Sequence, residues 1–117
     1  MSDLIKFQFS EFPDKGNRIK DDERYRLTDC NLGGLTVSMT ELHVGQETKG
    51  HFHDDEDEVY QFISGVGRMQ LGDDPDSAFP TASGMIVLVK AGDFHKLFND
   101  GDTDLVCWCV FNGGRNH

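Results

Sequence analysis

Three histidines and a glutamate have the types and spacing of metal ligands. His51 and His53 lie two residues apart in the stretch GQETKGHFHDDEDEVYQFISG, Glu58 follows after an acidic run, and His95 comes later. In an extended segment the imidazoles of His51 and His53 project from one face and can reach one ion. Three imidazoles and one carboxylate suit a divalent Fe, Mn, Ni, Co or Zn ion and are too nitrogen-rich for Ca²⁺ or Mg²⁺. The His51 and His53 pair alone fits a solvated acidic turn equally well.

The acidic run before Glu58 offers a competing carboxylate, Asp57. Strand alternation places Glu58, Tyr60 and Phe62 on one face and Asp57 on the other. We therefore expect Glu58 to be the ligand, with Tyr60 and Phe62 lining the pocket beside it. The remaining run, Asp54 to Asp57, is expected to form a solvated rim.

The elements that must position these residues are predicted to be short strands. The chain has 117 residues, with thirteen glycines, three prolines and nine phenylalanines, and no window carries a sustained 3.6-residue apolar period. This pattern predicts an all-β chain, as one domain over residues 1–117. The expected strands are 4–9, 25–30, 35–44, 59–64, 68–73, 85–90, 95–99 and 105–111.

Several details of these strands are predicted from alternation and turn residues. Residues 4–9 should form a first, edge strand, and residues 10–23 a loop or extended arm because of their polar residues and breakers. The strands at 59–64 and 68–73 should form a hairpin through the intervening glycines. Both faces of the strand at 105–111 look buried, with Cys107 and Cys109 in the core.

Composition excludes some functions. The net charge is −10, whereas nucleic-acid binding draws on clustered Lys and Arg, so no nucleic-acid partner is expected. No segment has the length of a membrane span, and the N-terminus lacks the pattern of a secretory leader. Three cysteines without framework spacing suit free thiols in a reducing compartment. We expect a soluble cytoplasmic protein without a membrane partner.

The first metal stretch resembles a known motif. Gly45, His51, His53, Glu58 and Gly65 match the first cupin motif at every fixed position. The resemblance implies that the two histidines and Glu58 are metal ligands.

The later stretch GMIVLVKAGDFHKLFN is similar to the second cupin motif. Gly84, Gly92, His95 and Asn99 stand at the right offsets, and Lys90 replaces the usual proline. Because proline presets φ and lysine does not, this change should alter the rigidity of the turn, but it removes no ligand. The resemblance implies that His95 completes the ligand set.

The likeness covers about residues 34–111, with 18 residues between the two motifs. It implies a small cupin jelly-roll β-barrel over that range, preceded by an N-terminal strand or arm at residues 1–33. His43 and His117 are expected to be ordinary surface or structural residues.

The stretches KGHFHDDEDEVYQFISGVGRMQL and FNDGDTDLVCWCVF look similar to parts of the cupin-type glucose-6-phosphate isomerases. This likeness implies a metal-dependent enzyme acting on a small polar metabolite such as a sugar or sugar phosphate. A bound cation would polarise substrate oxygens, and Glu58 could move a proton as the catalytic residue. The candidate phosphate contacts are Lys49, Arg68, Lys90 and Lys96.

Two other functions fit the same residues. A three-histidine site with open positions can serve a non-haem iron dioxygenase, and the same pocket could hold a small molecule or metal without turnover. Small cupins resemble one another in pairing through sheet faces and N-terminal strands. A homodimer is therefore expected, with apolar area from Phe7, Phe9, Phe12 and Trp108.

Overall fold

The computed structural model describes residues 4–51 and 56–113. Two short helical segments precede the strands: a 3₁₀ turn, Phe9–Glu11, and α1, Phe12–Lys15. A second 3₁₀ turn spans Pro75–Ser77. The strands are β1 Asn17–Asp21, β2 Tyr25–Leu32, β3 Leu35–Leu42, β4 Glu58–Ser64, β5 Gly67–Leu71, β6 Phe79–Pro80, β7 Ile86–Val89, β8 His95–Asn99 and β9 Leu105–Asn112.

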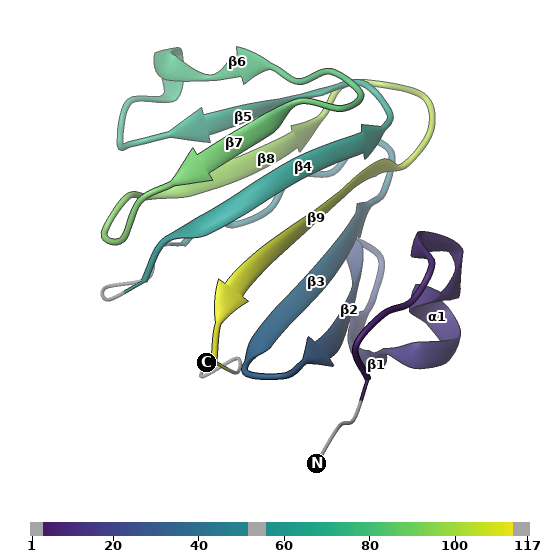
Figure 1. Ribbon diagram of the computed structural model, residues 1–117. Coiled ribbons are helices and arrows are strands. Elements are labelled where there is room, and N and C mark those ends of the chain that lie inside the picture. Colours follow the sequence, from purple (N-terminus) through teal and green to yellow (C-terminus); the bar gives the residue numbers. More distant parts are fainter. Residues whose placement is uncertain (1–3, 52–55, 114–117) are drawn as a thin grey trace.

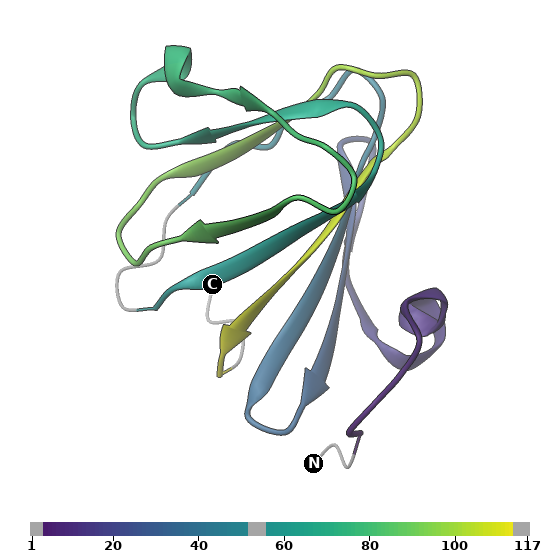
Figure 2. The ribbon, with the colours of Figure 1, turned by 45° about the horizontal axis from the view of Figure 1, so that its top comes forward.

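The strands form two antiparallel sheets that face each other (Figures 1 and 2). The larger sheet has the order β1-β2-β3-β9-β4-β7, and the smaller has the order β6-β5-β8. The side of the larger sheet that faces the smaller one is called the inner face below, and the opposite side the outer face. The predicted all-β class and jelly-roll barrel are confirmed. No helix of the described residues is long and apolar enough to cross a membrane.

The core lies between the two sheets. It contains inward-facing residues of both, including Leu42, Phe62, Met69, Leu97, Leu105 and Cys107. All three cysteines are buried free thiols, as the sequence predicted, and Cys107 and Cys109 belong to this core. Apolar burial of this kind is the main favourable contribution to folding.

The predicted hairpin of residues 59–64 and 68–73 is wrong. Strand β4 pairs with β7 and β9, whereas β5 pairs with β6 and β8, so the chain crosses between the sheets after Ser64. Gly65 makes this crossing at φ +95°, where a Cβ would lie 2.5 Å from the carbonyl oxygen of Asp104. The turn residues therefore mark a change of sheet, which local sequence does not distinguish from a tight turn.

The predicted first strand at residues 4–9 is also wrong. Residues 4–8 are irregular, Phe9 begins the first 3₁₀ turn, and the expected loop at 10–23 contains α1 and the edge strand β1. Pro13 suits the first turn of α1, where its missing N–H has no helical partner. Phe12 is 2% exposed and packs on the outer face, with the ring of Phe7 edge-on at 4.9 Å between centroids. The packing of Phe12 and Phe7 on the outer face thus outweighs the strand-like alternation of residues 4–9.

The outer face of β2, β3 and β9 carries the apolar side chains that this N-terminal segment covers. Val37 and Met39 point outward there, while Ser38 and Thr40 point inward. On β9 the inner residues are buried and the outer ones, such as Trp108, are half-buried, so the expected burial of both faces is complete on the inner face and partial on the outer face. The inner face of β3 is therefore polar at Ser38 and Thr40 and becomes apolar at Leu42, where the strand ends.

Replacement of Gly65 by alanine tests the crossing. The φ of +95° strains an L-residue, and the close carbonyl of Asp104 adds a clash. We expect Gly65→Ala to lower the free energy of unfolding by at least about 2 kcal/mol in urea denaturation. Gly84→Ala is the matched control, because Gly84 has φ +88° with open space around it, and should cost about 1 kcal/mol. Equal losses would contradict the close approach.

Burial of Cys107 predicts a dependence of stability on pH. Desolvation raises the pKa of this thiol to about 12, from 9.0 for an unperturbed thiol. Between these values the unfolded chain releases a proton that the folded chain keeps, so stability is fully present below pH 9 and falls as the pH rises. From pH 8 to 10 the loss should be on the order of 1 kcal/mol, measured by urea denaturation. Cys107→Ala should make the free energy of unfolding fall less steeply with pH over this range. The same steepness in wild type and Cys107→Ala would refute the contribution of this thiol.

Candidate metal centre

His51 and His95 lie side by side as partners of an isolated antiparallel bridge. The N–H of His51 donates to the carbonyl of His95 at 3.1 Å, and the N–H of His95 donates back to His51 at 2.9 Å. Directly opposed residues of such a pair send their side chains to the same face. The two rings accordingly lie 4.3 Å apart between centroids.

The segment before His51 is held along β8 as an irregular extension of the smaller sheet. Thr48 donates its N–H to the carbonyl of Leu97 and accepts the N–H of Leu97 with its hydroxyl. Gly50, at φ +81°, lets the ring of Phe94 occupy the space that a Cβ at this position would fill. Gly50 and Phe94 directly precede the two histidines, so this packing lies beside the point where their backbones pair.

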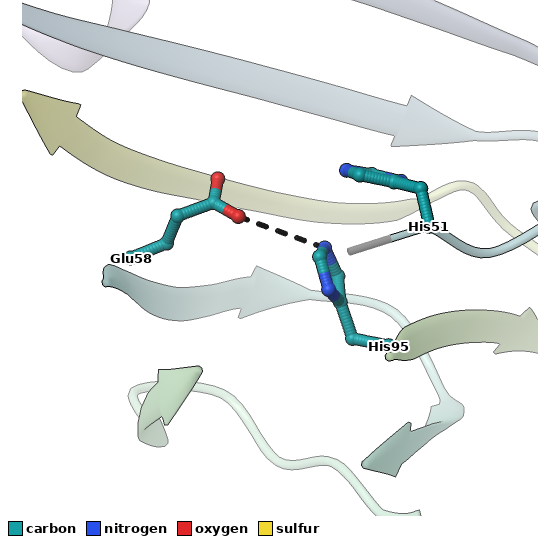
Figure 3. Close-up of side chains that lie close together, drawn as sticks. All are labelled: His51, Glu58 and His95. Atoms are coloured by element: carbon teal, nitrogen blue, oxygen red, sulfur yellow. Dashed lines mark ion pairs between the residues drawn. The ribbon is translucent and has the colours of Figure 1, made fainter. Parts of the chain in front are cut away.

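Glu58 opens β4 in the opposite sheet and points inward (Figure 3). The side chains of Glu58 and His95 are each 3% exposed, and Glu58 Oε2 lies 3.7 Å from His95 Nε2. The thiol of Cys109 donates to Glu58 Oε1 at 3.6 Å. One donor atom from each of His51, Glu58 and His95 lies within 4.8 Å of the others. Three of the four residues singled out by the sequence thus meet from both sheets.

The other acidic and histidine candidates lie elsewhere. His53, Asp54 and Asp55 fall outside the described residues. Asp57 is exposed and accepts the N–H of Ala91 at 2.8 Å, so its carboxylate caps a neighbouring turn. His43 Nδ1 lies 3.1 Å from Asp104 Oδ1, a structural contact away from the cluster.

The cluster opens on a cavity of about 340 Å³ on the inner face. Its lining is a mixture of polar and apolar side chains from β1, β2, β3, β4 and β9, together with His51: Ile19, Lys20, Tyr25, Leu27, Ser38, Thr40, His51, Glu58, Tyr60 and Cys109. Such a volume suits a small molecule.

Tyr60 and Phe62, both expected in the pocket, have different positions. Tyr60 lines the cavity with its hydroxyl 3.1 Å from His95 Nε2. Burial, followed by the neighbouring Cys109 and Glu58, raises the pKa of Tyr60 well above its usual value, so its hydroxyl keeps its proton at neutral pH. Phe62 is a core residue that does not line the cavity, with its ring 6.5 Å from that of Tyr60.

The four basic residues expected near a phosphate do not line the cavity. Arg68 and Lys96 lie on the far side of the smaller sheet, where both cover the ring of Phe98. Arg68 binds Asp100 through two hydrogen bonds of 2.6 and 3.1 Å, and Lys96 pairs with Glu47 at 2.8 Å. Their charges are therefore already matched away from the candidate centre.

The remaining two basic residues are exposed. Lys49 lines a separate surface hollow. Lys90 begins a turn in which its carbonyl accepts the N–H of Asp93, and Gly92 has φ +84°. The turn forms even though Lys90 replaces the motif proline, because the one positive φ that the turn needs is at Gly92.

Sequence reasoning missed several residues of the cavity wall. Ile19 and Lys20 went unnoticed because the segment that forms β1 reads as a loop. Alternation separated Ser38 and Thr40 from Val37 and Met39 on the two faces of a strand. It did not decide which of the two faces would point into the barrel. The phenylalanines near the N-terminus could have indicated the answer, because they can cover the apolar face of this strand and leave its polar face towards the cavity.

The donor set fits a divalent transition metal. Two imidazoles and a carboxylate converge where their atoms can share one ion, and these donor types favour Mn, Fe, Co, Ni or Zn over Ca²⁺ or Mg²⁺. His51, Glu58 and His95 are the described residues that would hold it. The fold and this cluster define a jelly-roll β-barrel with a candidate metal centre between its two sheets.

The chain belongs to the cupin family. The model of the cupin domain matches residues 38–111, which contain the cluster and most of the larger sheet. No curated protein matches the chain in sequence.

Among solved structures, the chain is similar to oxalate decarboxylases. A Bacillus subtilis oxalate decarboxylase is 20% identical with a TM-score of 0.73, over 86% of this chain and 29% of that one. The Lactobacillus farciminis enzyme in its formate complex is 17% identical with a TM-score of 0.71, over 80% and 30% of the two chains. A further B. subtilis structure, studied for its Mn(II) centres, is 20% identical with a TM-score of 0.73, over 86% and 28%. The chain spans less than a third of their length, and the likeness establishes the fold.

Proposed function

We propose that this cupin is a metal-dependent enzyme acting on a small polar metabolite, with isomerase-like chemistry on a sugar or sugar phosphate as the leading candidate. The observation that carries the proposal is the convergence of His51, Glu58 and His95, the first two of which line a cavity of about 340 Å³. His53, two residues from His51, is proposed as the fourth ligand. The oxygen-rich substrate named for the similar oxalate decarboxylases supports a small polar metabolite for this cavity as well.

The bound cation would act as a Lewis acid towards substrate oxygens. The residues of the chain supply binding and proton movement around it. The hydroxyl of Tyr60 keeps its proton, so it can donate a hydrogen bond to a substrate oxygen. Ser38 and Thr40 line the same cavity and can orient hydroxyl groups. Glu58 is the carboxylate of the cavity wall that we propose to hold or move the proton between adjacent carbons.

Variants of the cluster test the metal site. Purified without a chelator or a His-tag, the wild type should carry about one transition metal ion per chain, measured by elemental analysis. His95→Ala or His51→Ala should lower the metal content at least tenfold, because each removes a donor atom. His43→Ala is the matched control, since His43 lies away from the cluster, and should keep the metal. A metal-free wild type, or full metal content in both cluster variants, would refute the proposal.

The reaction is tested with the metal-loaded protein. We expect anaerobic interconversion of ketose and aldose sugars or their phosphates, and loss of this activity in Glu58→Gln. Oxygen consumption with small thiols or diketones, without that interconversion, would replace the proposal by a non-haem iron dioxygenase. If alanine at His51 and His95 abolished metal binding but left the biological role intact, the protein would instead be a non-catalytic binding module.

We also propose a homodimer, and we propose a second surface for it beside the one expected from the sequence. Of the residues expected there, Phe12 is buried within the chain, Phe7 and Trp108 are half-buried, and Phe9 is 40% exposed. An exposed apolar set remains on the outer face of β4 and β7, where Val59, Ile86 and Leu88 are 38%, 67% and 50% exposed. On a chain with net charge −10, an uncharged face lets two copies approach without local repulsion.

We expect light scattering at micromolar concentration to show a dimer of the wild type. Leu88→Glu should give a monomer, because it places a like charge in both halves of a two-fold interface. Ile5→Glu is the control, since Ile5 is 86% exposed on the N-terminal segment, and should stay dimeric. A monomeric wild type would rule out the homodimer.

A further inference from the structure

Strand β1 carries an irregularity that turns one lysine towards the cavity. Arg18 is opposite Thr28 and Lys20 is opposite Leu27, so Ile19 is an extra residue in the pairing with β2. Leu27 lines the cavity on the inner face, and so does its partner Lys20. In a regular strand Lys20 would share the outer face with Arg18, because successive side chains alternate. The extra residue re-aims Lys20, as β-bulges commonly do.

The surroundings of Lys20 keep its ammonium group at the cavity wall. Its Nζ lies 4.9 Å from the ring centroid of Tyr25, another lining residue, and 3.5 Å from Asp22 Oδ2. The other oxygen of Asp22 accepts the N–H groups of Arg24 and Tyr25, which lower the pKa of that carboxyl. The side chain of Lys20 stays 45% exposed and open to a ligand.

Among the described residues that line the cavity, Lys20 is the only lysine or arginine. It also borders an adjacent surface hollow of about 360 Å³, which contains Arg24 and Lys49. The hollow thus gathers three cations against two acidic residues, Asp22 and Glu23, beside the cavity, whereas the chain as a whole has a net charge of −10. A local positive field of this kind attracts small anions that the chain as a whole would repel.

We propose that Lys20 binds the oxyanion of a small ligand, a carboxylate or a phosphate, and so makes the cavity selective for anionic metabolites. This inference rests on the proposed function, since the same ligand would place its other oxygens near His51, Glu58 and His95. The hydroxyls of Ser38 and Thr40 lie on the shared wall. A lysine serves this role as a compact point charge with three donors, which suits either oxyanion.

Lys20→Gln in the full chain tests the inference. The probes are inorganic phosphate and malonate, titrated by calorimetry into protein loaded with Mn²⁺. The wild type should bind one of them, and the one that binds identifies the oxyanion. Lys20→Gln should weaken that binding at least tenfold, and Lys20→Arg should weaken it less, because the charge is kept. Lys15→Gln, which removes the same charge from an exposed position on α1, should stay within twofold of the wild type.

Equal binding by wild type and Lys20→Gln would overturn the inference, as would an absence of binding for both probes. Metal content is measured first, so that the two proposals fail separately. A wild type without metal refutes the proposed function, and the titration of the metal-free chain then decides the role of Lys20. In that titration, binding sensitive to Lys20→Gln supports the inference, and insensitive or absent binding overturns it.

Discussion

The backbone pairing of His51 with His95 is the interaction on which the candidate centre depends. Two reciprocal hydrogen bonds hold these residues opposite each other, so both rings project from one face of the smaller sheet. Glu58 approaches from the larger sheet, and its position requires the two sheets to face each other at the correct spacing. The centre therefore depends on the whole barrel, because its donors come from both of its walls.

The division of polar and apolar residues on β3 follows from this arrangement. The hydroxyls of Ser38 and Thr40 face the cavity, whereas Val37 and Met39 lie outside and need a cover. The N-terminal segment supplies this cover through Phe12, which is buried against Val37 and Met39. The inner face thus remains available for ligand binding while the outer apolar surface is removed from water.

Much of the fold and of the site could be predicted from the sequence, because the signals are local. Alternation placed Glu58 and Tyr60 on one face, and the glycine spacing led to the cupin motifs. The crossing at Gly65 was misread because a glycine turn looks the same whether the chain returns to one sheet or changes sheets. The segment before β1 was misread because burial of Phe12 is decided by distant strands.

The position of Lys20 shows the same limit most clearly. A single extra residue, Ile19, exchanges the faces of everything after it in the strand, and no pattern in NRIKD distinguishes the bulged pairing from the regular one. Arg18 lies before the extra residue and stays on the outer face, where it bonds Thr28 and Asp21. Two neighbouring cations of the same strand therefore acquire opposite surroundings, and only the one after the bulge can meet a ligand in the cavity.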